Sequence, residues 1–234
     1  MSRFWQSFNT RYNVYFNASQ AYIEGDKAKE SAHKDNYTEL LPVFLVGNKS
    51  SQNTGKGSYE TAITKCQKAI SLHSIKRRPV VNAGKRKNAK MKAYLQRKEY
   101  NPFLKNAWLM MGRAQFQKGD FLEAAATFSY ITRLYAAEPV VANEARQWMA
   151  RCYVQEKWYY DAEDALKRVR RDTTNTLTKH EADATQAALL LGQERYEEAI
   201  PYLKRAAKNA KGNFKQARLY YLLAQIYHQQ NHPQ

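Results

Sequence analysis

Residues that could carry out chemistry are scattered along this sequence rather than gathered into a recognisable site. The five histidines lie far apart, and His180-Glu181 lacks the second histidine of an HExxH zinc motif. Gly55-Lys56 resembles the end of a phosphate-binding loop, but that loop needs glycine where Ser50 stands and Ser or Thr where Gly57 stands. Glu197-Glu198 lies at a predicted helix start, where carboxylates favour the helix dipole. The sequence therefore predicts no catalytic, cofactor or metal site, and a protein that is not an enzyme.

Positive charge is the strongest chemical signal in the chain. The formal net charge is +17 over 234 residues, and residues 76–98 hold many basic residues and no acid. Such a run can hold anionic lipid, nucleic acid or an acidic protein, or it can be a solvated linker. It has one aromatic ring that could stack on a base, Tyr94, and no nucleic-acid motif, so nucleic acid is not favoured. The basic patch comprises Lys76, Arg77, Arg78, Lys85, Arg86 and Lys87, followed by Lys90, Lys92, Arg97 and Lys98.

The element that would position any binding residue is a pair of helices between Trp108 and Pro139. Gly119-Asp120 breaks the pair, and we expect Asp120 to cap the second helix. The combination of a large Trp108, a small Ala124 and a closing proline is the tetratricopeptide pattern, whose period is about 34 residues. The two apolar stripes at helical spacing are Trp108, Met111, Gly112 and Gln115, and then Phe121, Ala124, Ala125, Phe128 and Ile131.

Similar patterns return later in the chain. From Ala124 to Ala162 is 38 residues and from Ala162 to Ala199 is 37, and the helix around Tyr220 has first-helix spacing. Pro201 should kink the second helix of its copy. We therefore predict an all-α fold, a tetratricopeptide-type α-solenoid of antiparallel helix pairs with a basic loop insertion. Residues 1–75 would form divergent N-terminal helices with a loop at 42–57, residues 76–100 the basic insertion, and residues 101–234 the array. We expect the last repeat of the array to be incomplete, as in a fragment or in an end that pairs with something else.

The N-terminal part is predicted to hold one further pair. A first helix would run from Thr10 to Glu24 and stop at Gly25, and a second would run from Asp26 to Leu41. A short extended apolar segment, 41–46, and a polar loop would follow, and then an apolar helical stripe from Tyr59 to His73. Cys66 and Cys152 both lie on apolar stripes, which favours buried thiols over a disulfide.

The inner surface of such an array is lined by the first helices, and it is the expected docking surface. Arg113 and Arg151 occupy equivalent positions in adjacent repeats and could bind carboxylates of an extended peptide. The alternative is that both pair with Glu144 or other neighbouring acids. The residues predicted to face inward are Asn106, Arg113, Gln117, Gln147, Arg151 and Gln155.

Three longer strings carry a more specific resemblance. They are residues 10–17 (TRYNVYFN), 65–75 (KCQKAISLHSI) and 97–108 (RKEYNPFLKNAW), the last running on to Gly119-Asp120-Phe121. Together they resemble the PorW/SprE family of Bacteroidota, tetratricopeptide lipoproteins of the outer membrane that face the periplasm and are associated with type IX secretion and gliding motility. The resemblance implies a periplasmic scaffold whose partners are secretion or motility components.

Two sequence features bear on that implied location. Residues 1–9 contain neither an export signal nor a lipobox cysteine, and no run of 18 apolar residues is present. The functional expectation is a non-enzymatic protein-interaction scaffold. The alternative is binding of nucleic acid or anionic lipid through residues 76–98.

Overall fold

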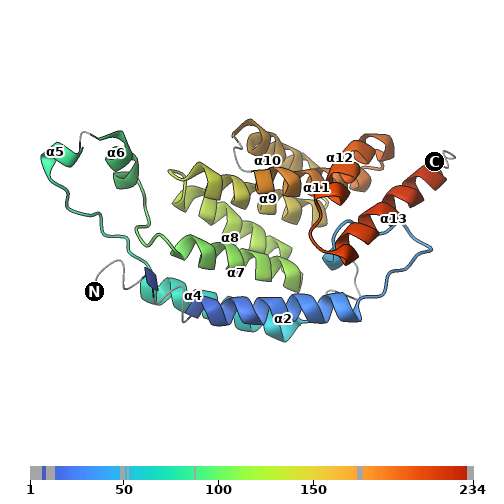
Figure 1. Ribbon diagram of the computed structural model, residues 1–234, viewed down its shortest axis with the longest axis horizontal. Helices are drawn as coiled ribbons and strands as arrows, with labels where there is room; N and C mark the ends of the chain where they lie inside the picture. Colours follow the sequence, from blue (N-terminus) through green and yellow to red (C-terminus); the bar gives the residue numbers. More distant parts are fainter. Residues whose placement is uncertain are drawn as a thin grey trace.

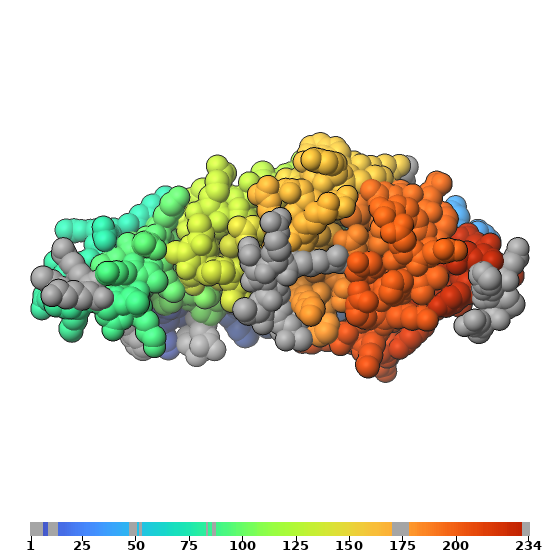
Figure 2. Space-filling model, turned by 90° about the horizontal axis from the view of Figure 1, so that it is seen from above, coloured from blue at the N-terminus to red at the C-terminus, as the bar shows by residue number. Residues whose placement is uncertain are grey.

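The computed structural model describes residues 7–8, 14–47, 51, 53–86, 88–172 and 176–230, and within these ranges the chain is helical with no strand. Helix pairs stack into an elongated array (Figure 1). Seen from above, consecutive segments follow one another along the long axis, from green through yellow to orange (Figure 2). The prediction of an all-α, tetratricopeptide-type α-solenoid is confirmed. The helices are α2 (Phe16–Ala32), α4 (Lys56–His73), α5 (Ala83–Arg86), α6 (Ala89–Leu95), α7 (Leu104–Lys118), α8 (Phe121–Leu134), α9 (Pro139–Gln155), α10 (Tyr159–Asp172), α11 (Thr176–Gly192), α12 (Tyr196–Asn209) and α13 (Asn213–Gln229), with a 3-10 turn, η2 (Leu45–Gly47).

The pair α7–α8 shows why small residues are needed where helices cross. A Cβ on Gly112 would lie 2.7 Å from the ring of Phe128, and Ala124 is completely buried. Between the helices Gly119 has φ +96°, a left-handed conformation that suits glycine. Asp120 occupies the N-cap position of α8, but its side chain makes no capping hydrogen bond. The predicted cap is wrong because the Asp120 carboxylate lies 2.6 Å from the Nζ of Lys118 instead.

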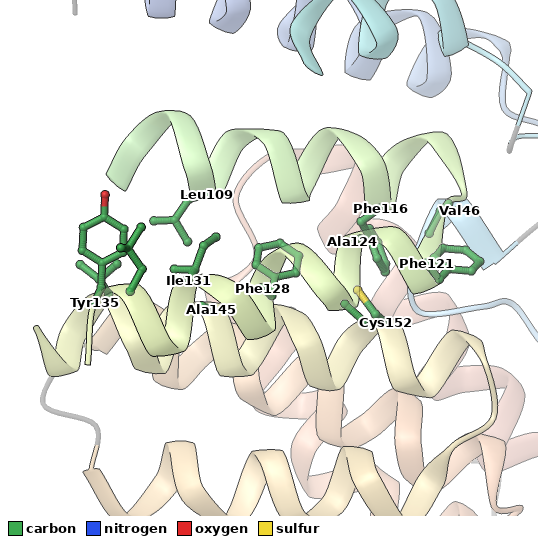
Figure 3. Packing of buried hydrophobic residues seen from close by; sticks show 13 residues of the cluster. Val46, Leu109, Phe116, Phe121, Ala124, Phe128, Ile131, Tyr135, Ala145 and Cys152 are labelled. Atoms are coloured by element: carbon green, nitrogen blue, oxygen red, sulfur yellow. The ribbon is translucent and has the colours of Figure 1, made fainter. Parts of the chain in front are cut away.

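Aromatic side chains fill the space between this pair and α9 (Figure 3). The rings of Phe128 and Trp148 stack at 5.9 Å, and Phe116 lies 5.4 Å from Phe121 and 5.5 Å from Trp148. Trp108 is half-buried at the junction of three apolar clusters. Large side chains therefore join neighbouring pairs, as the repeat pattern predicts.

Both cysteines lie inside these cores. Cys66 and Cys152 are free and buried, as predicted. Burial raises the pKa of the Cys66 thiol to about 12, so this thiol stays protonated near neutral pH and packs as a small apolar group.

The N-terminal pair differs from the prediction. The helix α2 continues through Gly25 as far as Ala32, and its packing partner is α4 rather than a helix over residues 26–41. Gly25 does not end the helix, because glycine is needed there for a close approach: a Cβ would lie 2.8 Å from the ring of Tyr59. The Tyr59 hydroxyl then donates to Asp26 Oδ1 at 2.7 Å.

Residues 33–47, which we name the crossing segment, connect α2 to the far end of the array. Leu41 is buried in the cluster formed by α11, α12 and α13, and Val46 is buried in the cluster formed by α7, α8 and α9 (Figure 3). Lys215 of α13 also lies 3.3 Å from Glu30 of α2. The first and last described helices are therefore linked across the concave side.

The basic insertion projects from the end of the array that is opposite α13 (Figure 1). Its base is held by Glu99, whose carboxylate accepts hydrogen bonds from Ser74 Oγ at 2.6 Å and from the backbone N–H of Ile75 and Asn101 at 2.8 Å. Of the predicted basic patch, Lys76, Arg77, Arg78 and Lys85 are exposed, Arg86 ends α5, and Lys87 lies outside the described residues.

The later pairs follow the repeat. A Cβ on Gly192 of α11 would lie 2.7 Å from the hydroxyl of Tyr159 of α10, so glycine again marks a close approach. The helix α12 continues through Pro201 and buries Ala199 and Leu203. The described chain ends with α13, which packs its apolar side against α12.

Candidate protein-docking surface

A cavity of about 500 Å³ opens on the concave side of the array. It is lined by α2, α7, α9, α11 and α13, by the last turn of α12, and by Val43, Phe44 and Leu45 of the crossing segment. Apart from that turn, the helices are those that begin each pair, as the repeat register predicts. We name this cavity and its walls the concave surface.

The structure brings four of the six predicted inward-facing residues together. Arg113, Gln117, Gln147 and Arg151 all line the cavity. Asn106 lies in the first turn of α7, where its amide donates to the Phe103 carbonyl at 3.1 Å, and Gln155 ends α9. These two residues lie outside the set that lines the cavity, because they sit at the ends of their helices.

Arg113 is already engaged within the chain. Its guanidinium forms an ion pair with Glu144 of α9 and lies 5.5 Å from the centre of the Trp148 ring. Its buried Nε has no hydrogen-bond partner within the described part of the chain. The alternative left open at the sequence level, pairing with Glu144, is what the structure shows for this residue.

Arg151 is more enclosed, with 5% of its side chain exposed. Its guanidinium lies between two rings, 4.1 Å from that of Phe44 and 4.3 Å from that of Trp148. One Nη donates to Glu181 Oε2 at 2.6 Å. Desolvation opposes ionisation of Glu181, but attraction to Arg151 outweighs it, and the pKa of this carboxyl is lowered. Arg151 thus joins α9, α11 and the crossing segment.

Gln147 stabilises the same junction. Its amide donates to Thr185 Oγ1 at 2.8 Å and to the Glu181 carbonyl at 3.3 Å. Because Gln147 is almost fully buried, these hydrogen bonds fix α11 against α9 and leave the amide little freedom to bind a partner.

Lys29 is a cavity residue that sequence reasoning missed. Its side chain is buried, its Nζ donates to the backbone carbonyl of Gln117, and it lies 5.0 Å from the Tyr59 ring. Desolvation lowers the pKa of Lys29 to about 8, although Asp26 acts in the opposite direction. A lysine on a helix usually faces water, so only the fold reveals its burial.

Two residues of α13 that sequence reasoning also missed hold the crossing segment. Arg218 forms a bidentate pair with Asp35, with contacts of 2.8 and 3.1 Å, and donates to the Pro42 carbonyl at 3.2 Å. Gln225 accepts from the Leu41 N–H at 3.0 Å and donates to the Glu39 carbonyl at 2.8 Å. No local signal could reveal contacts between residues more than 170 positions apart.

The electrostatics of Asp35 follow from this burial. Desolvation alone would raise its pKa, but hydrogen bonds from Arg218 and His33 outweigh desolvation, and the pKa of Asp35 is lowered. His33 Nε2 lies 2.6 Å from Asp35 Oδ1. The carboxylate is therefore ionised near neutral pH and holds Arg218 in place.

The described ranges also bear on metal binding and on membrane crossing. No group of three or more His, Cys, Asp or Glu side chains in these ranges is arranged to hold a metal ion. Among the described helices, none combines the length and the apolar character that crossing a bilayer requires.

Comparison with known proteins supports the repeat assignment. A family model described as tetratricopeptide repeat matches residues 184–234, which include the second half of α11 and all of α12 and α13. No curated protein matches the chain. The chain thus contains a tetratricopeptide repeat, a class that generally mediates protein–protein interaction, and no enzyme family is indicated.

Proposed function

We propose that this chain is a non-enzymatic scaffold that binds an extended segment of a partner protein on its concave surface. The observation that carries this proposal is the cavity itself, where the first helices place Phe116, Trp148 and Arg151 together beside polar groups. Apolar rings with a few fixed polar groups are the usual composition of a site for a peptide segment.

The three strings that resemble the PorW/SprE family support a more specific proposal. In it, the scaffold works at the periplasmic face of the outer membrane, and its partners belong to the type IX secretion or gliding machinery. The all-helical repeat array is compatible with this assignment. The support for this envelope assignment is the resemblance itself, in residues 10–17, 65–75 and 97–108. Of the first string, the structure describes residues 14–17.

Photo-crosslinking in the cells that make the protein tests both levels. A photo-reactive residue replaces Gln117, which lines the cavity, and a control replaces Tyr160, which is 85% exposed on α10. We expect protein adducts from position 117 that position 160 does not give. Equal adducts from both positions would refute docking on the concave surface. Adducts dominated by cytoplasmic proteins would refute the envelope proposal alone.

A second candidate function is binding of an anionic membrane surface through the basic insertion. The observation that favours it is that Lys76, Arg77, Arg78 and Lys85 are exposed on a segment that projects from the array. Basic clusters near an anionic surface contribute about 1 kcal/mol per residue. Flotation with phosphatidylglycerol vesicles should therefore decrease when these four become Glu. Binding that survives the change would exclude the insertion as the contact.

A further inference from the structure

The crossing segment lies where a bound peptide would lie in an array of this kind. Val43, Phe44 and Leu45 form part of the cavity wall, and Leu41 and Val46 are 3% and 1% exposed. The segment is not part of any helix pair from Lys34 to Phe44, and it reaches the cluster of α7, α8 and α9 and the cluster of α11, α12 and α13. Its position thus resembles that of a ligand more than that of a repeat element.

Its backbone is recognised by side chains of the array. The amide of Gln225 both accepts from the N–H of Leu41 and donates to the carbonyl of Glu39, and Arg218 donates to the carbonyl of Pro42. Recognition of main-chain groups fixes the path of an extended peptide without dictating its side chains. These contacts would hold any peptide whose backbone follows the same path, including the turn at residues 37–39.

Its side chains supply the selectivity. Phe44 lies 4.1 Å from the guanidinium of Arg151 and 6.3 Å from the ring of Phe116, an aromatic site that a cation covers on one side. Leu41 and Val46 each enter an apolar cluster, and Asp35 pairs with Arg218. A partner segment that matches these contacts would carry an acid at the position of Asp35. Six residues later it would continue with an apolar residue, a proline, an apolar residue and an aromatic residue, as residues 41–44 do.

We propose that the concave surface binds, in trans, a partner segment with the chemistry and backbone path of residues 35–46, and that the crossing segment is its intramolecular competitor. This inference rests on the proposed function and deepens it by naming the class of partner. A tethered competitor has an effective concentration on the order of millimolar, so a free peptide meets a surface that is already occupied. Weakening the tethered copy should therefore tighten binding of the free one.

The test uses the full chain and a fluorescent peptide of residues 35–47, DNYTELLPVFLVG. Phe44→Ala in the protein removes the ring contact of the competitor and leaves the parts of the wall that the helices supply unchanged. Burying one phenylalanine corresponds to a factor of about 10–100 in an equilibrium constant. We expect fluorescence anisotropy to show peptide affinity rising by up to that factor over the unaltered chain.

Matched variants identify the surface. In the Phe44→Ala chain, Gln225→Ala should weaken binding of the peptide, because it removes the two hydrogen bonds to the peptide backbone. Gln229→Ala, an exposed residue one turn later on the same helix, should not. A peptide with alanine in place of its phenylalanine should bind more weakly than the parent. Equal affinity for the Phe44→Ala and unaltered chains, or binding that ignores Gln225, would overturn the proposal.

Hydrogen exchange on the unaltered chain gives a second measurement in case Phe44→Ala fails to fold. Saturating peptide should speed exchange of the Leu41 amide by displacing the crossing segment, and unchanged exchange would overturn the proposal. If the chain forms concentration-dependent dimers and the peptide dissociates them, the surface binds the crossing segment of a second copy. That result would overturn the proposal of a different partner protein. Adducts at position 117 without peptide binding would overturn this inference and leave the docking function standing.

Discussion

Removing the guanidinium of Arg218 tests whether one buried ion pair holds the crossing segment. Arg218 and Asp35 have 8% and 5% of their side chains exposed, and the pair is bidentate. Arg218→Met keeps most of the side-chain volume but leaves the buried Asp35 carboxylate with His33 and without its guanidinium partner. Breaking a buried pair in this way costs about 3–5 kcal/mol. Three lost charge-assisted contacts at about 1.5–3 kcal/mol each bring the estimate to at least that size.

Urea unfolding followed by circular dichroism at pH 7 measures this loss. The control is Arg195→Met, which removes an exposed pair with Glu198 and should unfold close to the unaltered chain. Asp35→Asn combined with Arg218→Met should recover much of the loss, because no buried charge then remains. If Arg218→Met costs no more than Arg195→Met, the pair does not hold the segment and the reasoning is refuted.

The same pair predicts a dependence on pH. Because the pKa of Asp35 is lowered in the folded chain, its stabilising effect is complete above the unfolded carboxyl pKa of about 4 and is lost as pH falls through the folded value. The difference in unfolding free energy between the unaltered chain and Arg218→Met should therefore shrink as the solution is acidified below about pH 4. A difference that stays constant would contradict the assignment of this charge.

Three further changes test other parts of the fold. Gly112→Val should cost about 1–3 kcal/mol by overpacking Phe128, whereas Gly57→Ala, with open space around its position, should not lower the melting temperature. Lys29→Met removes an amine whose pKa is lowered to about 8 in the folded chain, so that between pH 8 and about pH 10 the unfolded chain binds the proton more strongly. The unfolding free energy of the unaltered chain minus that of the variant should therefore rise over this range, and a flat difference would contradict the burial of this amine. Glu99→Ala should speed hydrogen exchange at the base of the basic insertion, and unchanged exchange there would show that this carboxylate is dispensable.

The parts of the fold that sequence predicted are those set by local contacts. Gly119, Ala124 and Phe128 belong to one helix pair, so their spacing alone indicates the turn and the crossing. Gly25 was misread because a glycine that ends a helix and one that admits a neighbouring ring look alike in sequence. Glycine is needed at position 25 because of the Tyr59 ring, and Tyr59 lies more than 30 residues away in the sequence.

The candidate site divides in the same way. The repeat register predicts Arg113 and Arg151 on the inner surface, and both line the cavity, because both positions follow from helical periodicity. It gave no account of Arg218 and Gln225, whose partners lie near the other end of the chain. Burial of Lys29 also required the fold, since the covering groups come from α4 and α7.

In the proposed docking, the distribution of charge favours apolar contacts over the arginines as the source of affinity. Each of its three arginines already has an acid: Arg113 has Glu144, Arg151 has Glu181 and Arg218 has Asp35. An incoming carboxylate would replace an ion pair by another of similar energy, which yields little net free energy. In the Phe44→Ala chain, where no ring occupies that site, an incoming ring gains about 1.5–3 kcal/mol by burial alone. We therefore expect the exposed lysines and arginines of the insertion to contribute little to the proposed docking.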